Sequence, residues 1–114
     1  MAQIHTREQK MEKIIADIEK YDPKPDKKLI EGLYRRLAGV MGRADSRTVA
    51  MSDPKEVATI RNGFIKKTLG VDKRDKADQA IESVRDMMKK DRSKSRMTTY
   101  YLLAKELKKA SALK

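Results

Sequence analysis

The sequence has no cysteine and only one histidine among its 114 residues. Without cysteine, the chain cannot form disulfides, thiolate metal sites or a cysteine nucleophile, which fits a reducing compartment. The single histidine, His5, lies near the N-terminus, where chains are usually poorly ordered, and leaves little material for a Ser-His-Asp relay. A phosphate loop of the GxxxxGK[ST] type is also missing. We therefore expect no enzyme, no cofactor and no metal site.

Long hydrophobic runs are missing too. The longest extends from Tyr100 to Ala104, whereas a helix that spans a membrane needs about 20 apolar residues. The first residues contain no apolar stretch of the length found in signal peptides. We therefore expect a cytoplasmic protein that does not contact a membrane.

Apolar residues recur at helical spacing along most of the chain, while the strict alternation of exposed strands is nearly absent. This pattern predicts an all-α fold, a compact bundle of about five helices in a single domain over residues 1–114. We expect residues 1–25 to form a peripheral N-terminal helix with a proline-rich linker. Residues 26–114 should form the core, with the last helix at its centre because its apolar surface is the widest.

Polar residues and glycines mark the expected helix ends. Short side chains that accept hydrogen bonds from backbone amides favour the first position of a helix, and glycine favours the position after its last turn. The expected terminators are Gly42 and Gly70. The expected caps are Thr6 (in a capping box with Gln9), Asp26, Asp53, Asp75 and Ser95.

Two residues do not fit the third predicted helix. On a wheel of 100° per residue, Arg61 falls between Val57 and Ile65, inside the apolar arc. We expect it to be a buried arginine that pairs with a carboxylate or, alternatively, a clamp for an anionic ligand. Gly63, in mid-helix, is less favourable than alanine by about 1 kcal/mol and suggests close approach by another helix.

The charge balance is strongly positive, with 28 lysines and arginines against 17 acids and a formal net charge of +11. Such an excess attracts polyanions. It is densest between residues 89 and 96, where five basic side chains accompany one acid. The hydroxyls there and the free amides of the next helix can add phosphate contacts. The candidate anion or nucleic-acid site comprises Lys89, Lys90, Arg92, Ser93, Lys94, Ser95 and Arg96.

Other interpretations of these patterns remain open. A solvated charged turn explains residues 89–96 without any ligand, and an acidic protein partner would also suit the basic surface. The segment 39–42 (GVMG) has the form of a GxxG loop that clamps nucleic acid, but that module needs a β-sheet, so a glycine-terminated helix is favoured. The spacing of Ile4, Met11 and Ile18 predicts a protein–protein adaptor or a weak homodimer. A further alternative is an enzyme that acts on a small anionic substrate held by Arg61 and Arg92, but the sequence offers no general base for it.

Two segments resemble a known family. Residues 88–104 (MKKDRSKSRMTTYYLLA) are similar to the signature KxDRxKSRxTxYYLLA of a bacterial family of small proteins classed only as a domain of unknown function. Residues 61–70 (RNGFIKKTLG) resemble the third-helix region of the same family. The likeness covers about residues 45–114, without the first helix and its linker. It implies a bacterial, cytoplasmic, helical protein and transfers no catalytic residue.

These observations favour a small basic binding module without enzymatic activity. Its expected partner is a polyanion, with nucleic acid as the first choice. The alternative is an adaptor or homodimer that uses the N-terminal helix. We expect a monomer or a weak dimer.

Overall fold

The computed structural model describes residues 7–37, 48–91 and 94–113. Five α-helices dominate this part of the chain: α1 (Arg7–Glu19), α2 (Lys27–Leu37), α3 (Pro54–Thr59), α4 (Arg74–Met87) and α5 (Arg96–Glu106). A π-helix, η2 (Ile60–Thr68), continues α3, and a short 3₁₀ helix, η3 (Ala110–Ala112), follows α5. Two-residue strands, β1 (Thr48–Val49) and β2 (Lys94–Ser95), pair antiparallel. The predicted all-α bundle is therefore confirmed, with a minimal two-stranded ribbon that the sequence did not predict.

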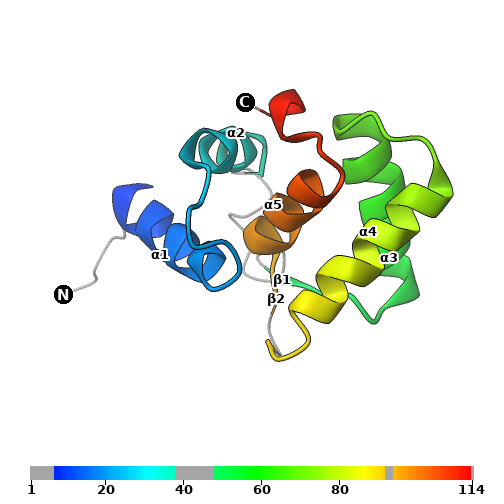
Figure 1. Ribbon diagram of the computed structural model, residues 1–114, viewed down its shortest axis with the longest axis horizontal. Coiled ribbons are helices and arrows are strands. Elements are labelled where there is room, and N and C mark those ends of the chain that lie inside the picture. The colour runs from blue at the N-terminus through cyan, green and yellow to red at the C-terminus, as the bar shows by residue number, and fades with distance from the viewer. Residues whose placement is uncertain (1–6, 38–47, 92–93, 114) are drawn as a thin grey trace.

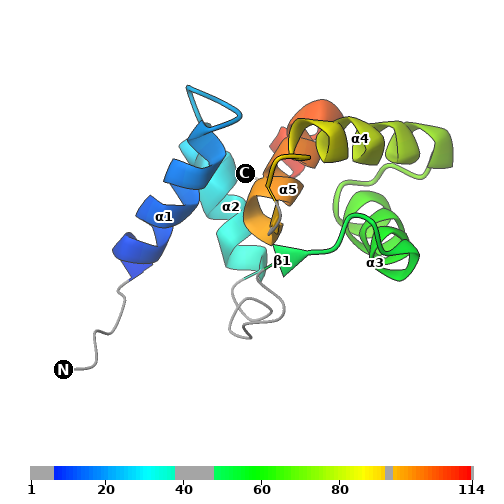
Figure 2. The same ribbon diagram turned by 90° about the horizontal axis from the view of Figure 1, so that it is seen from below.

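Helix α5 lies at the centre of the molecule. In both views α1 and α2 lie on one side of it, while α3 and α4 lie on the other (Figures 1 and 2). Every residue from Met97 to Ala104 is buried, so this helix is enclosed on all sides rather than along one stripe. The central position predicted for the last helix is confirmed.

Helices α2, η2 and α4 each contribute buried apolar residues to the core around α5. The ring of Phe64 in η2 stacks on the ring of Tyr100, with the centroids 4.1 Å apart. A stacked aromatic pair adds stabilisation beyond the area that it buries. The other fully or nearly fully buried residues of α2, η2 and α4 include Leu29, Ile30, Leu33, Ile60, Ile65, Ala77, Ile81 and Val84.

Three of the predicted caps are confirmed. The side chain of Asp53 accepts a hydrogen bond from the backbone amide of Lys55 at 3.0 Å. Asp26 accepts one from the amide of Leu29 at 3.2 Å, and Ser95 caps α5 through the amide of Thr98. Each contact satisfies a donor that the first turn of a helix leaves unpaired.

The cap predicted at Asp75 is wrong. Helix α4 begins at Arg74, and its N-cap is Lys73, whose backbone is extended and whose side chain makes no capping hydrogen bond. Asp75 lies instead in the first turn, where a carboxylate interacts favourably with the helix dipole. The terminator at Gly70 is confirmed by its positive φ of 75°. Thr6 and Gly42 lie outside the described residues.

The second part of the predicted third helix is a π-helix. In η2 the amide of Leu69 donates to the carbonyl oxygen of Phe64, five residues earlier, at 2.9 Å. Residues five apart therefore lie above one another, in place of the four-residue rows of an α-helix. This wider turn places Arg61 at the edge of the buried face, where its side chain is 19% exposed. The α-helical wheel placed Arg61 inside the apolar arc, and its mostly covered side chain, paired with Asp78, agrees with that prediction.

Gly63 does not mark a close helix approach. A Cβ atom at this residue would meet no other atom within 4 Å. The contact that the sequence predicted there is therefore absent from the described residues.

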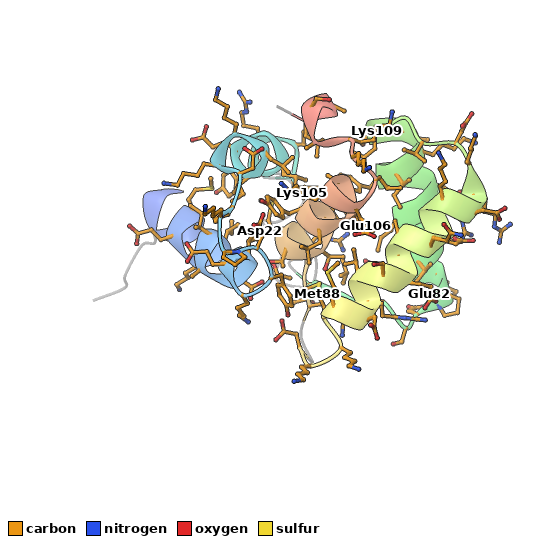
Figure 3. All side chains as sticks on the ribbon, in the orientation of Figure 1. Asp22, Glu82, Met88, Lys105, Glu106 and Lys109 are labelled. Atoms are coloured by element: carbon orange, nitrogen blue, oxygen red, sulfur yellow. The ribbon has the colours of Figure 1, made fainter. Side chains whose placement is uncertain are left out.

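Polar contacts join α1 and its linker to α5. The hydroxyl of Thr98 donates to Asp17, and the hydroxyl of Tyr101 donates to Asp22 at 2.6 Å. Asp22 lies in the linker beside α5 (Figure 3). Between these contacts Ile18 is fully buried. Helix α1 and its linker thus combine one deeply buried apolar residue with two carboxylates that accept hydrogen bonds from α5.

Candidate anion-binding site

Lys89 and Lys90 follow the end of α4 and project into solvent. Both are exposed, and the side chain of Lys89 is 70% accessible. Its ammonium lies 4.0 Å from the carboxylate of Asp86, at the limit of an ion pair, and an exposed pair of this kind contributes little. Arg92 and Ser93, two further members of the predicted site, lie outside the described residues. The exposed cations of this turn are therefore Lys89 and Lys90, within the part of the chain that the structure describes.

The one acid of the segment, Asp91, is directed towards α1. It accepts a hydrogen bond from the hydroxyl of Tyr21, and the ammonium of Lys20 lies 3.6 Å from its other oxygen. Burial, reinforced by the hydrogen bond to Asp91, raises the pKa of Tyr21. The hydrogen bond to Asp17 and the charge of that carboxylate raise the pKa of Lys20. The carboxylate of Asp91 thus contacts Lys20 and Tyr21, and not the described basic residues that adjoin Asp91 in the sequence.

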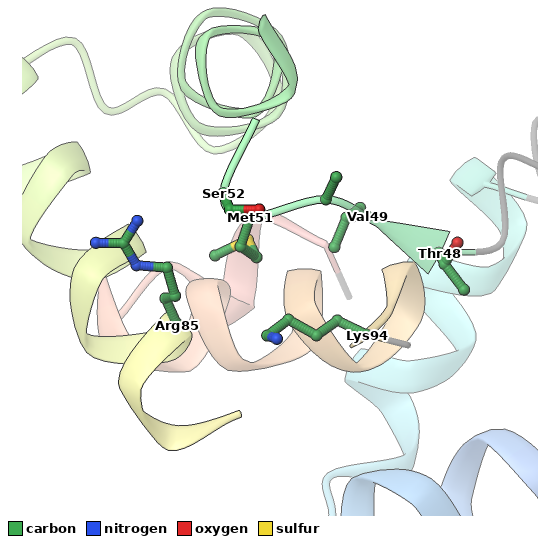
Figure 4. A pocket seen from close by; sticks show the side chains of 7 residues that line it. Thr48, Val49, Met51, Ser52, Arg85 and Lys94 are labelled. Atoms are coloured by element: carbon green, nitrogen blue, oxygen red, sulfur yellow. The ribbon is translucent and has the colours of Figure 1, made fainter. Parts of the chain in front are cut away.

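Lys94 belongs to a different part of the site. It lies in β2 opposite Val49, and its ammonium donates to the carbonyl oxygen of Asp91 at 2.8 Å. Its side chain extends along a pocket of about 310 Å³ towards the side where Arg85 of α4 lies (Figure 4). The residues that line this pocket are Thr48, Val49, Ala50, Met51, Ser52, Arg85 and Lys94.

Arg85 is a cation of this pocket that sequence reasoning missed. It forms an ion pair with Glu82 on the same helix, and its side chain remains 43% exposed. In the sequence it is one of many charged residues on a helix surface. It becomes part of a pocket because the pairing of β1 with β2 brings residues 48–52 towards α4. A strand of two residues leaves no periodic signal that would predict this pairing.

Arg96 is directed inward. Its guanidinium donates to the carboxylate of Glu56 at 3.0 Å and to the hydroxyl of Tyr100 at 2.7 Å. A third contact reaches the carbonyl oxygen of Thr48 at 3.4 Å. With its side chain only 12% exposed, Arg96 joins α5 to α3 and β1. It therefore supports the fold rather than presenting its charge to a ligand.

The second candidate, Arg61, also has a carboxylate partner. Its guanidinium lies 2.9 Å from the carboxylate of Asp78 in α4, and Nε of Arg74 lies 3.6 Å from the other oxygen of that carboxylate. This is the kind of partner that we expected for Arg61. The same arginine lines a pocket between η2 and α4 together with Lys66 and Lys73. The structure thus separates the two candidates, since Arg61 is near the start of α4 and the basic turn is at its end.

Metal-ligand clusters and helices that could span a membrane are both absent from the described residues. No group of three or more histidine, aspartate or glutamate side chains among them is arranged to hold a metal ion. None of the helices in the described ranges is long and apolar enough to cross a membrane.

Comparison with known proteins identifies the family. A search of curated proteins found no match. A family model described as "Protein of unknown function (DUF2853)" matches residues 13–111. This match is longer than the resemblance noted in the sequence, because it also includes the second half of α1, the linker and α2. The chain therefore belongs to this family of proteins of unknown function.

Proposed function

We propose that the chain is a binding module without enzymatic activity for a polyanion, with nucleic acid as the first choice. The contact surface is the turn after α4, with Lys89 and Lys90, extended by Lys94 and Arg85 along the neighbouring pocket. One observation carries the proposal: the only acid of the basic segment is engaged by α1 and its linker. The exposed Lys89 and Lys90 can therefore present their charge to a ligand.

The chemistry of this surface favours phosphates over bases. Lysine ammonium groups act as point charges that displace the counterions of a nucleic acid, and such contacts carry no base information. Stacking of single-stranded bases needs exposed aromatic rings. Every aromatic residue of the chain is buried or half-buried: Tyr21, Tyr34, Phe64, Tyr100 and Tyr101. We therefore expect binding that is independent of sequence and stronger for duplexes.

The adaptor function ranks second because the part of the predicted stripe within the described residues packs against the protein's own core; Ile4 lies outside them. Ile18 is fully buried, while Met11 and Ile14 are half-buried against the same core. A helix that has packed this face on its own domain offers less of it to a partner. We therefore expect a monomer, which light scattering tests directly.

Fluorescence anisotropy with a short labelled DNA duplex tests the proposal. Affinity should fall with salt, with a log–log slope of about −0.9 for each phosphate neutralised. The site variant replaces Lys89, Lys90, Arg92 and Lys94 with glutamine and should lower both the affinity and the slope. Arg96 is kept because its contacts support the fold.

The matched control removes the same charge at exposed positions on other elements. It replaces Lys13, Lys27, Lys28 and Lys105 with glutamine and leaves out Lys20, which contacts Asp91. The proposal predicts that the control retains most of the affinity. Equal losses in both variants would mean that net charge alone drives binding. No binding at low salt would contradict the proposal and direct attention to an acidic protein partner.

A further inference from the structure

A pocket of about 280 Å³ lies between η2 and the start of α4. Its basic side chains come from three places: Arg61 and Lys66 in η2, Lys73 in the connecting segment, and Arg74 at the first position of α4. The one acid that lines it is Asp72. The pocket therefore combines a concave shape with an excess of positive charge.

The π-helical geometry of η2 assembles one wall of this pocket. On an α-helix, side chains five residues apart point about 140° away from each other. In η2 the hydrogen bonds close over five residues, so Arg61 and Lys66 lie on the same side of the helix. π-Helical turns are rare and are often found at functional sites. Here the wider turn brings two cations together that an α-helix would separate.

Asp78 holds the two arginines of the pocket in place. One of its carboxylate oxygens lies 2.9 Å from Arg61 and the other lies 3.6 Å from Arg74. A guanidinium has five N–H donors, so a single contact with Asp78 does not exhaust either arginine. The side chain of Arg74 is 74% exposed, whereas that of Arg61 is 19% exposed. Arg61 is therefore the mostly covered arginine at the pocket wall, and Arg74 is the one more accessible to a ligand.

We propose that this pocket binds the phosphate group of a small phosphomonoester. Planar guanidinium groups bind phosphate through paired N–H donors, and lysines add point charge. The backbone amides at the start of α4 are close by, and Lys73, the N-cap, offers them no side-chain acceptor. The volume suits a small ligand rather than a polymer. This inference does not depend on the polyanion surface, which lies at the other end of α4, about 20 Å away.

Titration of the full chain with inorganic phosphate, followed by amide nuclear magnetic resonance, tests the pocket. Saturable shifts are expected for Asn62 and for residues 74–77. The triple variant Lys66→Gln, Lys73→Gln and Arg74→Gln should weaken binding by at least about tenfold. These three side chains are exposed, so the variant should keep the dispersed spectrum of the folded protein. If it does not, the single variant Lys66→Gln replaces it, with a smaller loss expected.

The control variant Lys27→Gln, Lys28→Gln and Arg35→Gln removes the same charge from the exposed side of α2. It should leave phosphate binding unchanged. Absence of saturable binding, shifts confined to other residues, or equal weakening in the control would overturn the proposal. A second arm uses the labelled duplex: the pocket variant should bind it as the wild type does. If the pocket variant loses duplex binding while inorganic phosphate does not bind, the pocket serves a polymer and the inference is wrong.

Discussion

Gly63 and Gly70 both have open space where a Cβ atom would lie, but they differ in backbone conformation. Gly63 has free space where a methyl group would lie and a backbone that alanine can adopt, whereas Gly70 has a φ of 75°. Gly63→Ala should stabilise the protein by about 0.4–1 kcal/mol, because alanine restricts the unfolded chain more than glycine does. Gly70→Ala should destabilise it by about 1–2 kcal/mol, because a Cβ is strained in the left-handed region. Urea unfolding measures both, and a loss of stability in Gly63→Ala would contradict the open environment of that residue.

Arg96 and Lys90 are both basic residues of the same segment, but their structural roles differ. Arg96→Gln removes charge-assisted hydrogen bonds to Glu56 and Tyr100, and should lower the free energy of unfolding by about 1.5–3 kcal/mol. Lys90→Gln changes an exposed side chain and should stay within about 0.5 kcal/mol of the wild type. Chemical denaturation of the two variants compares them directly. Equal stabilities would mean that Arg96 is not part of the structural network.

At the level of the helix, α5 contributes more buried residues than any other helix of the described residues. Leu103 is fully buried at the centre of α5, whereas Met87 at the end of α4 is 41% exposed. Leu103→Ala should lower stability by about 2–5 kcal/mol through lost burial and the cavity left behind. Met87→Ala should change it by no more than about 0.5 kcal/mol. Thermal and urea unfolding test this, and similar losses in the two variants would argue against a central α5.

Several helix boundaries follow from the sequence alone because their determinants are local. Asp53 and Ser95 reach amides only two or three residues away, so a short window of sequence contains both partners. The start of α4 is different. Asp75 was expected to cap it, but the helix begins one residue earlier, after a lysine that makes no side-chain cap. Packing of α4 on α5 outweighs that local preference.

The π-helical register of η2 could not be read from the sequence. The spacing of Val57, Ile60 and Phe64 fits an α-helix, and it gives no sign of the wider turn that follows. Phe64 and Leu69 are five residues apart and both are buried, whereas an α-helix would point them about 140° away from each other. Burial of both residues in the folded protein therefore favours the wider turn. The second pocket could not be predicted for the same reason.

At the scale of the whole molecule, tyrosine ionisation should limit stability at high pH. Burial, followed by the hydrogen bond to Asp22, raises the pKa of Tyr101 from 10.0 to about 12. Burial also raises the pKa of Tyr100. A raised pKa in the folded state means that folding favours the protonated phenol. This stabilisation should be complete below about pH 10 and should be lost as the pH rises towards 12.

Tyrosinate absorbance and circular dichroism, followed together during an alkaline titration, measure this effect. We expect the buried tyrosines to ionise as the helical signal falls. Tyr101→Phe should be less stable at neutral pH, since it loses contacts with Asp22 and Asp26, but its stability should fall less steeply above pH 10. Ionisation of all four tyrosines at the usual pKa, with the helical signal intact, would refute the prediction.

The sequence by itself determined the helical class, the central last helix and the dense positive charge of residues 89–96. The helical class and the central helix follow from the spacing of apolar residues along the chain, and the dense charge follows from composition. Each of these can be read from neighbouring residues without knowledge of the fold. The tertiary structure alone decided which of those charges face solvent. Asp91 meets Tyr21 across 70 residues and Arg96 meets Glu56 across 40. Pairings at such separations depend on how the helices pack, so equal charges in the sequence acquire different roles in the fold.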